Sequence, residues 1–266
     1  MDEDLQDQRI FDALQMKFNG GKDRPDTGSD WVLSLGRYFL GTPYAAGTLD
    51  KGGPETLIVN LREFDCFTFV ENVVALARVL SSGPGSFERY RETLMSLRYR
   101  RGRPEGYASR LHYFSDWLFE NQRRGMIKNM SRMPGAQKLA KKIDLMTRHP
   151  ADYPALKDHN TYRQMQLVER RLSDRAIYYI PRTSMKEAAV RIADGDLIAV
   201  TARAEGLDVA HVGIAVRVKR QLHLLHASSR AGRVILSPET LNRYLAESGN
   251  RTGIMVARAA ETALFS

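Results

Sequence analysis

The sequence contains one cysteine, Cys66, among 266 residues. A single cysteine cannot form an intramolecular disulfide, so the chain has no disulfide framework from which a compartment could be inferred. Long apolar runs are also lacking. The longest, such as VVALA and DLIAV, are far shorter than the roughly 20 residues that a transmembrane helix requires. We therefore expect no membrane span.

The first residues, MDEDLQDQRI, lack the basic and apolar regions of a secretory signal. The sequence as given is therefore that of a cytoplasmic protein, or of an exported protein whose signal is absent from it. A net charge of +9 favours anionic partners. The densest basic run, 89–104, alternates Arg with Tyr, but a solvated helix face accounts for it better than a nucleic-acid surface, so we predict no nucleic-acid partner.

Motifs of several enzyme classes are also absent. No HExxH or CxxC spacing suggests zinc, no GxGxxG or GxxxxGK[ST] suggests a nucleotide, and no GxSxG suggests a serine hydrolase. Three of the six histidines fall in the middle of the chain without a second ligand four residues on; they are His112, His149 and His159. We expect neither a metal ion nor a cofactor.

The spacing of apolar residues changes along the chain. Residues 30–39 have helical spacing with Asp30 as a plausible N-cap, and helices are also predicted within 109–125, 135–149 and 160–172. From about residue 176 onwards, short β-branched or alternating runs predict an antiparallel meander, closed by a last helix near 241–245 and a strand near 253–258. This segregated order predicts an α+β fold.

Cys66 lies where a segment with helical apolar spacing begins, and Asp65 is a suitable N-cap for it. In the first turn of a helix, unpaired N–H groups and the positive end of the helix dipole favour a thiolate, so we expect a lowered pKa. The alternative is a buried thiol that acts only as a small hydrophobic side chain. The position favours a nucleophile, which needs a base and a residue to orient that base.

His211 begins the apolar strand HVGIAVRV, and its side chain shares a face with small residues. The next run, QLHLLHASS, carries His223 and His226 an odd number of positions apart. In a regular strand they point to opposite faces, so at most one of them can join His211. We predict that His226, which has small neighbours, is this partner and that His223 faces solvent. The same parity argues against a zinc site.

Several local motifs follow one another in a distinctive order. DCFTFV resembles an Asp-Cys-Ser-Gly-Phe-Val helix start, GTPYAAG a Gly-x-Pro-Tyr-x-x-Gly loop, and DGDLIAV, HVGIAV and LLHAS a set of three strands. The reference motifs in this comparison are those of the NlpC-type, papain-like superfamily of bacterial cell-wall cysteine peptidases and amidases, which the sequence therefore resembles. SRLHYFSDWLFENQ and GLDVAHVGIAV further resemble its N-acetylmuramoyl-L-alanine amidase-like subgroup.

The resemblance implies that Cys66 is the nucleophile, that His211 is the general base and acid, and that His226 orients His211. It places Tyr44 and Asp65 beside the substrate. It also implies a single catalytic domain, 1–266, whose papain-like core comprises 1–81 and 176–266. In that core an antiparallel sheet packs against the cysteine-bearing helix, and residues 82–175 form a large helical insertion.

The activity that the resemblance implies is hydrolysis of an amide bond in peptidoglycan or muropeptides, between N-acetylmuramic acid and L-alanine. One alternative is an endopeptidase that cuts the stem peptide between D-glutamate and the diamino acid. Another is a basic wall-binding or nucleic-acid-binding protein without catalysis. A wall substrate favours a periplasmic or secreted location over the cytoplasm. Phe67 and Thr68 replace the small Ser-Gly pair of the motif, so we expect a reshaped cleft beside Cys66.

Overall fold

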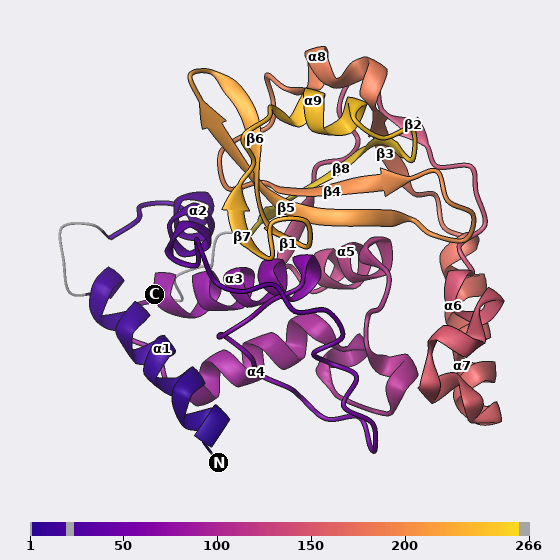
Figure 1. The fold of residues 1–266 in the computed structure, drawn as a ribbon, viewed down its shortest axis with the longest axis horizontal. Coiled ribbons are helices and arrows are strands. Elements are labelled where there is room, and N and C mark those ends of the chain that lie inside the picture. Colours follow the sequence, from indigo (N-terminus) through magenta and orange to yellow (C-terminus); the bar gives the residue numbers. More distant parts are fainter. Residues whose placement is uncertain (1, 20–23, 261–266) are drawn as a thin grey trace.

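The computed structural model describes residues 2–19 and 24–260. They form an α+β fold built around one antiparallel sheet whose strands differ in length. In Figure 1 the sheet lies across the middle of the molecule, with helices covering both of its faces. Within the described residues, no helix is both long enough and apolar enough to cross a bilayer.

The sheet confirms the predicted meander in its second half. Four successive strands pair in chain order, β4-β5-β6-β7, but β8 enters between β3 and β4, and β1 also pairs with β8. The strands are β1 (Ile127–Asn129), β2 (Gln137–Lys138), β3 (Tyr178–Pro181), β4 (Leu197–Ala202), β5 (Val209–Val218), β6 (Gln221–Ser228), β7 (Arg233–Leu236) and β8 (Arg251–Ala259).

The helices fall into two groups by size. The longer ones are α1 (Asp2–Asn19), α2 (Gly28–Tyr38), α3 (Cys66–Ser81), α4 (Phe87–Arg98), α5 (Phe114–Arg123) and α7 (His159–Ser173). The short ones are α6 (Leu145–Arg148), α8 (Met185–Ala188) and α9 (Leu241–Ala246), together with the 3-10 turns η1 (Arg100–Gly102), η2 (Tyr107–Ser109), η3 (Pro150–Asp152), η4 (Pro154–Lys157) and η5 (Arg182–Ser184).

The two faces of the sheet bury different parts of β5. Val212, Ile214 and Val216 pack in the main core with α2, α3 and α5, whereas Ala215 belongs to a second core with α8 and α9. This alternation is the one expected of a strand that is buried on both faces. Figure 1 shows α3 under the sheet and α9 above it, so the two cores lie on opposite faces of the sheet.

Two expectations from the sequence are wrong. Asp30 is not the N-cap of α2: Thr27 takes that position, and Asp30 completes a capping box by accepting from the Thr27 backbone N–H at 3.1 Å. Residues 135–149 are not one helix, because tertiary hydrogen bonds hold this segment extended. The Lys141 ammonium donates to the carbonyls of Ala202 (3.1 Å) and Leu207 (2.8 Å), and only α6 is helical.

The segment expected as a helical insertion, 82–175, therefore has a mixed structure. It contains α4 and α5, which lie beside α3, and α6 and α7, which lie at one end of the molecule (Figure 1). It also contributes β1 and β2 to the sheet. We call residues 82–175 the insertion. Backbone pairing of β1 and β2 joins the insertion to the sheet, so the insertion cannot move relative to the sheet without breaking those pairs.

Candidate active site

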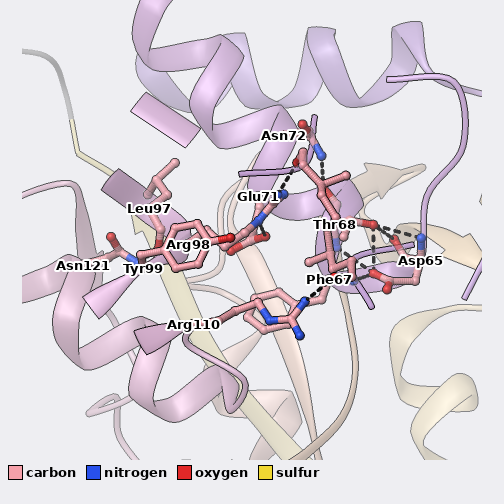
Figure 2. A network of polar contacts seen from close by, with 12 residues as sticks. Asp65, Phe67, Thr68, Glu71, Asn72, Leu97, Arg98, Tyr99, Arg110 and Asn121 are labelled. Carbon is pink, nitrogen blue, oxygen red and sulfur yellow. Dashed lines mark hydrogen bonds and ion pairs between the residues drawn. The ribbon is translucent and has the colours of Figure 1, made fainter. Parts of the chain in front are cut away.

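The start of α3 carries Cys66 as its first residue, and Asp65 caps it as the sequence predicts. Asp65 Oδ1 accepts hydrogen bonds from the backbone N–H groups of Phe67 (2.9 Å) and Thr68 (2.7 Å). In return, the Thr68 hydroxyl oxygen accepts from the Asp65 backbone N–H at 2.9 Å, which completes a capping box (Figure 2). Thr68 is buried and its hydroxyl completes the cap, so this substitution for a small residue stabilises the helix start, and the side chain also lines an adjoining cavity.

One turn further along, α3 is fixed by a buried ion pair. Arg98 Nε donates to Glu71 Oε2 at 2.8 Å, and both side chains are at most 3% exposed. The same guanidinium donates from Nη1 to the Ile58 carbonyl at 2.5 Å. Figure 2 shows this pair beside the capping box on the same helix. Because Arg98 ends α4, the pair joins α3 to α4.

Phe67, the other replacement noted in the sequence, packs against the insertion. Its ring lies 5.8 Å from that of Phe114 and 6.0 Å from that of Trp117, both on α5. It is half-buried and lines a cavity on that side of α3. The large side chain therefore joins α3 to α5 and shapes the adjoining cavity, as expected of this replacement.

His211 and His226 meet across β5 and β6, as strand parity predicts. His211 Nε2 and His226 Nδ1 are 2.7 Å apart, and the two rings are nearly perpendicular at 88°. This hydrogen bond uses Nε2 of His211 and leaves its Nδ1 for other contacts. His223 lies on the opposite face, but it is half-buried and its Nδ1 donates to the Ser237 carbonyl at 2.9 Å, so the expectation that it faces solvent is wrong.

Cys66 approaches this pair through the backbone of β5. The backbone N–H of Val212, the residue after His211, lies near enough to the Cys66 sulfur to favour its thiolate, as do the N–H groups of Cys66 itself and Phe67. Helix α3 packs directly against β5 and β6. The structure thus packs the helix that carries the thiol against a β-hairpin, distant in sequence, that carries both imidazoles.

Burial dominates the ionisation of these groups. It raises the pKa of the Cys66 thiol to about 12, with a further rise from the Asp65 carboxylate, although backbone N–H groups counter this. It lowers the pKa of His211 to about 3, with the charges of His226 and Arg251 adding to the effect, and that of His226 to about 4. The expected lowering of the thiol pKa by the helix dipole is therefore wrong in direction: the resting pair is a thiol beside a neutral imidazole.

Tyr44 lies close to the thiol, as the motif GTPYAAG implies. Its backbone N–H donates to the Gly232 carbonyl at 2.9 Å, and it forms a parallel bridge with Phe64, two residues before Cys66. Burial raises the pKa of its hydroxyl, and negative charge on Cys66 and Asp65 raises it further. The phenol therefore stays protonated and can donate a hydrogen bond beside the thiol.

Two residues of this region escaped the sequence analysis. The Tyr244 ring, on α9, lies 6.0 Å from that of His211 and 5.7 Å from that of His226. The Arg251 guanidinium, at the start of β8, stacks over the Tyr244 ring at 3.7 Å. Neither belongs to a local motif: Tyr244 reaches the histidines because α9 packs on the sheet, and Arg251 lies on β8 and lines the same cavity as both histidines.

Two cavities are lined by residues of this region. The histidine-side cavity, about 750 Å³, is lined by residues that include His211, His226, Ser229, Arg230, Tyr244 and Arg251. The insertion-side cavity, about 180 Å³, is lined by residues that include Asp65, Phe67, Tyr107, Arg110, His112 and Tyr153. The residue before Cys66 thus lines the insertion-side cavity, and both histidines line the other.

The described part of the chain offers no group of three or more His, Cys, Asp or Glu side chains arranged to hold a metal ion. His211 and His226 form a pair whose facing nitrogens already bond to each other. The arrangement is suited instead to nucleophilic chemistry, in which a thiol transfers its proton to a neutral imidazole.

Comparison with known proteins places the chain in a family. A structure of an N-acetylmuramoyl-L-alanine amidase from Bacteroides uniformis is 36% identical, with a TM-score of 0.81 over 88% of this chain and 99% of the other. A Bacteroides fragilis protein provisionally named a xylanase is 40% identical, with a TM-score of 0.79 over 85% and 99%. A Legionella pneumophila protein, 22% identical, shares the fold over 97% and 96% with a TM-score of 0.75.

No curated protein sequence matches the chain. The model of one protein family matches residues 34–254, which include the start of α3 and the strands that carry both histidines. The chain therefore belongs to the N-acetylmuramoyl-L-alanine amidase-like family.

Proposed function

We propose that this protein is a cysteine amidase that hydrolyses the amide bond between N-acetylmuramic acid and L-alanine in peptidoglycan or muropeptides. The observation that carries the mechanism is the 2.7 Å contact between His211 and His226. His211 lies on β5, and the next residue of that strand, Val212, directs its backbone N–H to the Cys66 sulfur. Family membership and the Bacteroides uniformis amidase support the substrate class.

In the proposed reaction, the Cys66 sulfur attacks the lactyl carbonyl carbon while its proton passes to His211. The C–N bond then breaks as His211 returns that proton to the nitrogen of L-alanine, which leaves with the stem peptide. A water molecule, deprotonated by the same imidazole, hydrolyses the remaining thioester and restores the thiol. Because the resting thiol and imidazole are neutral, proton transfer accompanies attack instead of preceding it.

The other groups stabilise charge that develops during these steps. His226 accepts or donates at His211 Nε2 and so fixes the orientation of the ring, which leaves Nδ1 to exchange the proton of the thiol. The N–H of Cys66 and the protonated phenol of Tyr44 are suited to stabilise the oxyanion of the tetrahedral intermediate. Asp65 uses Oδ1 for the helix cap, whereas its Oδ2 makes no hydrogen bond to any described residue and can take a donor of the substrate.

We further propose that residues 1–81 and 176–266 form a papain-like, NlpC-type core and that 82–175 is an insertion within one catalytic domain, 1–266. The packing of α3 against β5 and β6 supports this division. A wall substrate places the protein in the periplasm or outside the cell. Action in the cytoplasm on imported turnover fragments is the alternative.

The test is digestion of intact sacculi and of purified muropeptides, followed by liquid chromatography and mass spectrometry. Release of the complete stem peptide with a free L-alanine amine supports the amidase. Release of a peptide that begins with the diamino acid, with L-Ala-D-Glu left on the muramic acid, would instead identify an endopeptidase. The Cys66→Ala variant must be inactive; undiminished cleavage by it would end the cysteine mechanism. Xylan serves as a second substrate, because cleavage of xylan alone would reject a wall amidase.

A further inference from the structure

The histidine-side and insertion-side cavities differ in the chemical groups that line them. The histidine-side cavity contains the imidazole of His211, which in the proposed mechanism protonates the leaving nitrogen. A general acid must lie within hydrogen-bond reach of the atom that it protonates. The leaving stem peptide therefore extends into the histidine-side cavity, and the acyl half of the substrate must extend away from it, across the start of α3.

The sizes of the cavities agree with this direction. The histidine-side cavity, about 750 Å³, is within the range of roughly 300–1,000 Å³ that is usual for sites of extended small molecules. A peptide of several residues fits such a space. The insertion-side cavity, about 180 Å³, is below that range and admits one compact group.

The insertion-side cavity is lined by aromatic rings from the insertion. Tyr107 and Tyr153 are both half-buried, and each lines the cavity. The Arg110 guanidinium lies 4.9 Å from the centre of the Tyr107 ring, and Arg110 is paired with Asp50. The Tyr107 ring is thus held by Arg110 and by the His112 ring, whose centroid lies 4.4 Å away. Tyrosine rings offer rigid apolar surface that suits the C–H face of a sugar ring.

His112 gives this cavity a directed hydrogen-bond acceptor. Its Nε2 donates to the Tyr107 carbonyl at 2.9 Å, and burial lowers the pKa of the ring to about 3, so the imidazole is neutral. The remaining nitrogen, Nδ1, then carries a lone pair. Among the residues that the structure describes, none hydrogen bonds to Nδ1, so it is free to accept from a hydroxyl or amide N–H of a ligand.

We propose that the insertion-side cavity binds the muramyl sugar of the substrate, stacked on Tyr107 and Tyr153 with a polar group bonded to His112 Nδ1. This assignment rests on the proposed function. It makes the insertion the part of the molecule that selects for the sugar, whereas the sheet and α9 contact the peptide. Arg230 and Arg251 in the histidine-side cavity are suited to the carboxylates of that peptide.

The test compares two substrates that share the scissile amide: N-acetylmuramoyl-L-Ala-D-Glu-diaminopimelate, and the D-lactyl tripeptide that lacks the sugar ring. The Tyr107→Ala and Tyr153→Ala variants should each lose about tenfold in kcat/KM on the first substrate, as expected for one lost stacking contact. On the second substrate they should match the wild type. Tyr153→Phe keeps the ring and should retain the preference for the sugar.

Arg230→Ala is the contrasting variant. It changes the histidine-side cavity, which holds the peptide that both substrates share, so it should reduce kcat/KM equally on both. Thermal unfolding of each variant separates lost binding from lost folding. If the tyrosine variants lower kcat/KM equally on both substrates, or on neither, the assignment of the sugar to this cavity is overturned. If the wild-type enzyme cleaves both substrates with equal efficiency, this inference fails while the proposed function stands. If it cleaves neither, the proposed function itself fails.

Discussion

The two sides of the Cys66 helix are built differently. On the histidine side, His211 and His226 come from adjacent strands of one hairpin, and a simple alternation of side chains brings them together. On the insertion side, the lining comes from the loop after α2, the start of α3 and two separate parts of the insertion. Chemistry that depends on proton transfer is thus placed by local strand geometry, whereas selection of the substrate depends on long-range packing.

The two sides also differ in how charge is balanced. On the insertion side, buried cations have acidic partners: Arg98 pairs with Glu71, and Arg110 with Asp50 and Glu55. On the histidine side, His211 and His226 face each other without a carboxylate in contact, and neighbouring positive charge lowers their pKa values. The insertion side is organised for rigidity, and the histidine side keeps a neutral base that can accept a proton.

The largest expected effect comes from the histidine side. His211→Ala should reduce kcat by roughly 10²- to 10⁴-fold, because the general base and acid is lost. Stability should change little, because a buried neutral imidazole is removed without leaving a charge unpaired. His223→Ala, in the same sheet but bonded only to the Ser237 carbonyl, is the matched control and should stay within about twofold of the wild type. Equal losses in the two variants would contradict the assigned roles.

The insertion side should respond in the opposite way. Arg98→Met leaves Glu71 buried and unpaired, which should lower the free energy of unfolding by about 3–5 kcal/mol, measured by urea denaturation. The kcat of the remaining folded enzyme should stay close to that of the wild type. The double variant Glu71→Leu with Arg98→Met removes both charges and should recover much of the stability. A loss of kcat without a loss of stability would remove the contrast between the two sides.

Acid should destabilise the protein through its buried histidines. The unfolded pKa is near 6.5, whereas the folded values are about 3 for His211 and about 4 for His226. Between pH 6.5 and 4 the unfolded chain binds more protons, so stability falls as the pH falls. In His226→Gln, the difference in unfolding free energy between pH 7 and pH 4.5 should shrink by about 2 kcal/mol. An unchanged difference would mean that His226 is not held neutral.

The smallest effect is expected at the junction of the two sides. Asp65→Ala removes the cap of α3 and should cost about 1 kcal/mol of unfolding free energy, whereas Asp65→Asn retains a capping oxygen and should cost less. Denaturant unfolding of the two variants checks this order. If Asp65→Asn preserves stability but raises KM, the carboxylate also contacts the substrate.

Local rules predicted the parts of the site that depend on local geometry. The Asp65 cap, the position of Cys66 in the first turn of α3 and the choice of His226 over His223 follow from helix and strand periodicity. The position of β8 between β3 and β4 could not be predicted in this way, because it depends on pairing between strands that are distant in sequence.

Residues that act through tertiary packing were missed for the same reason. Tyr244 contacts the histidine rings only because α9 folds back over the sheet. The extended form of 135–149 depends on carbonyl groups from beyond β4 that bind Lys141, which helical periodicity does not reveal. The raised pKa of Cys66 was also missed, because burial by surrounding elements outweighs the dipole of its own helix.

The most direct test of the account is to trap and weigh the covalent intermediate. N-acetylmuramoyl-L-Ala-D-Glu-diaminopimelate is mixed with the enzyme, the reaction is quenched in acid, and the intact protein and its proteolytic peptides are analysed by mass spectrometry. The account predicts an adduct of one N-acetylmuramoyl group, joined as a thioester to the peptide that contains Cys66 and absent from Cys66→Ala. An adduct of N-acetylmuramoyl-L-Ala-D-Glu on Cys66, or turnover by Cys66→Ala, would contradict it.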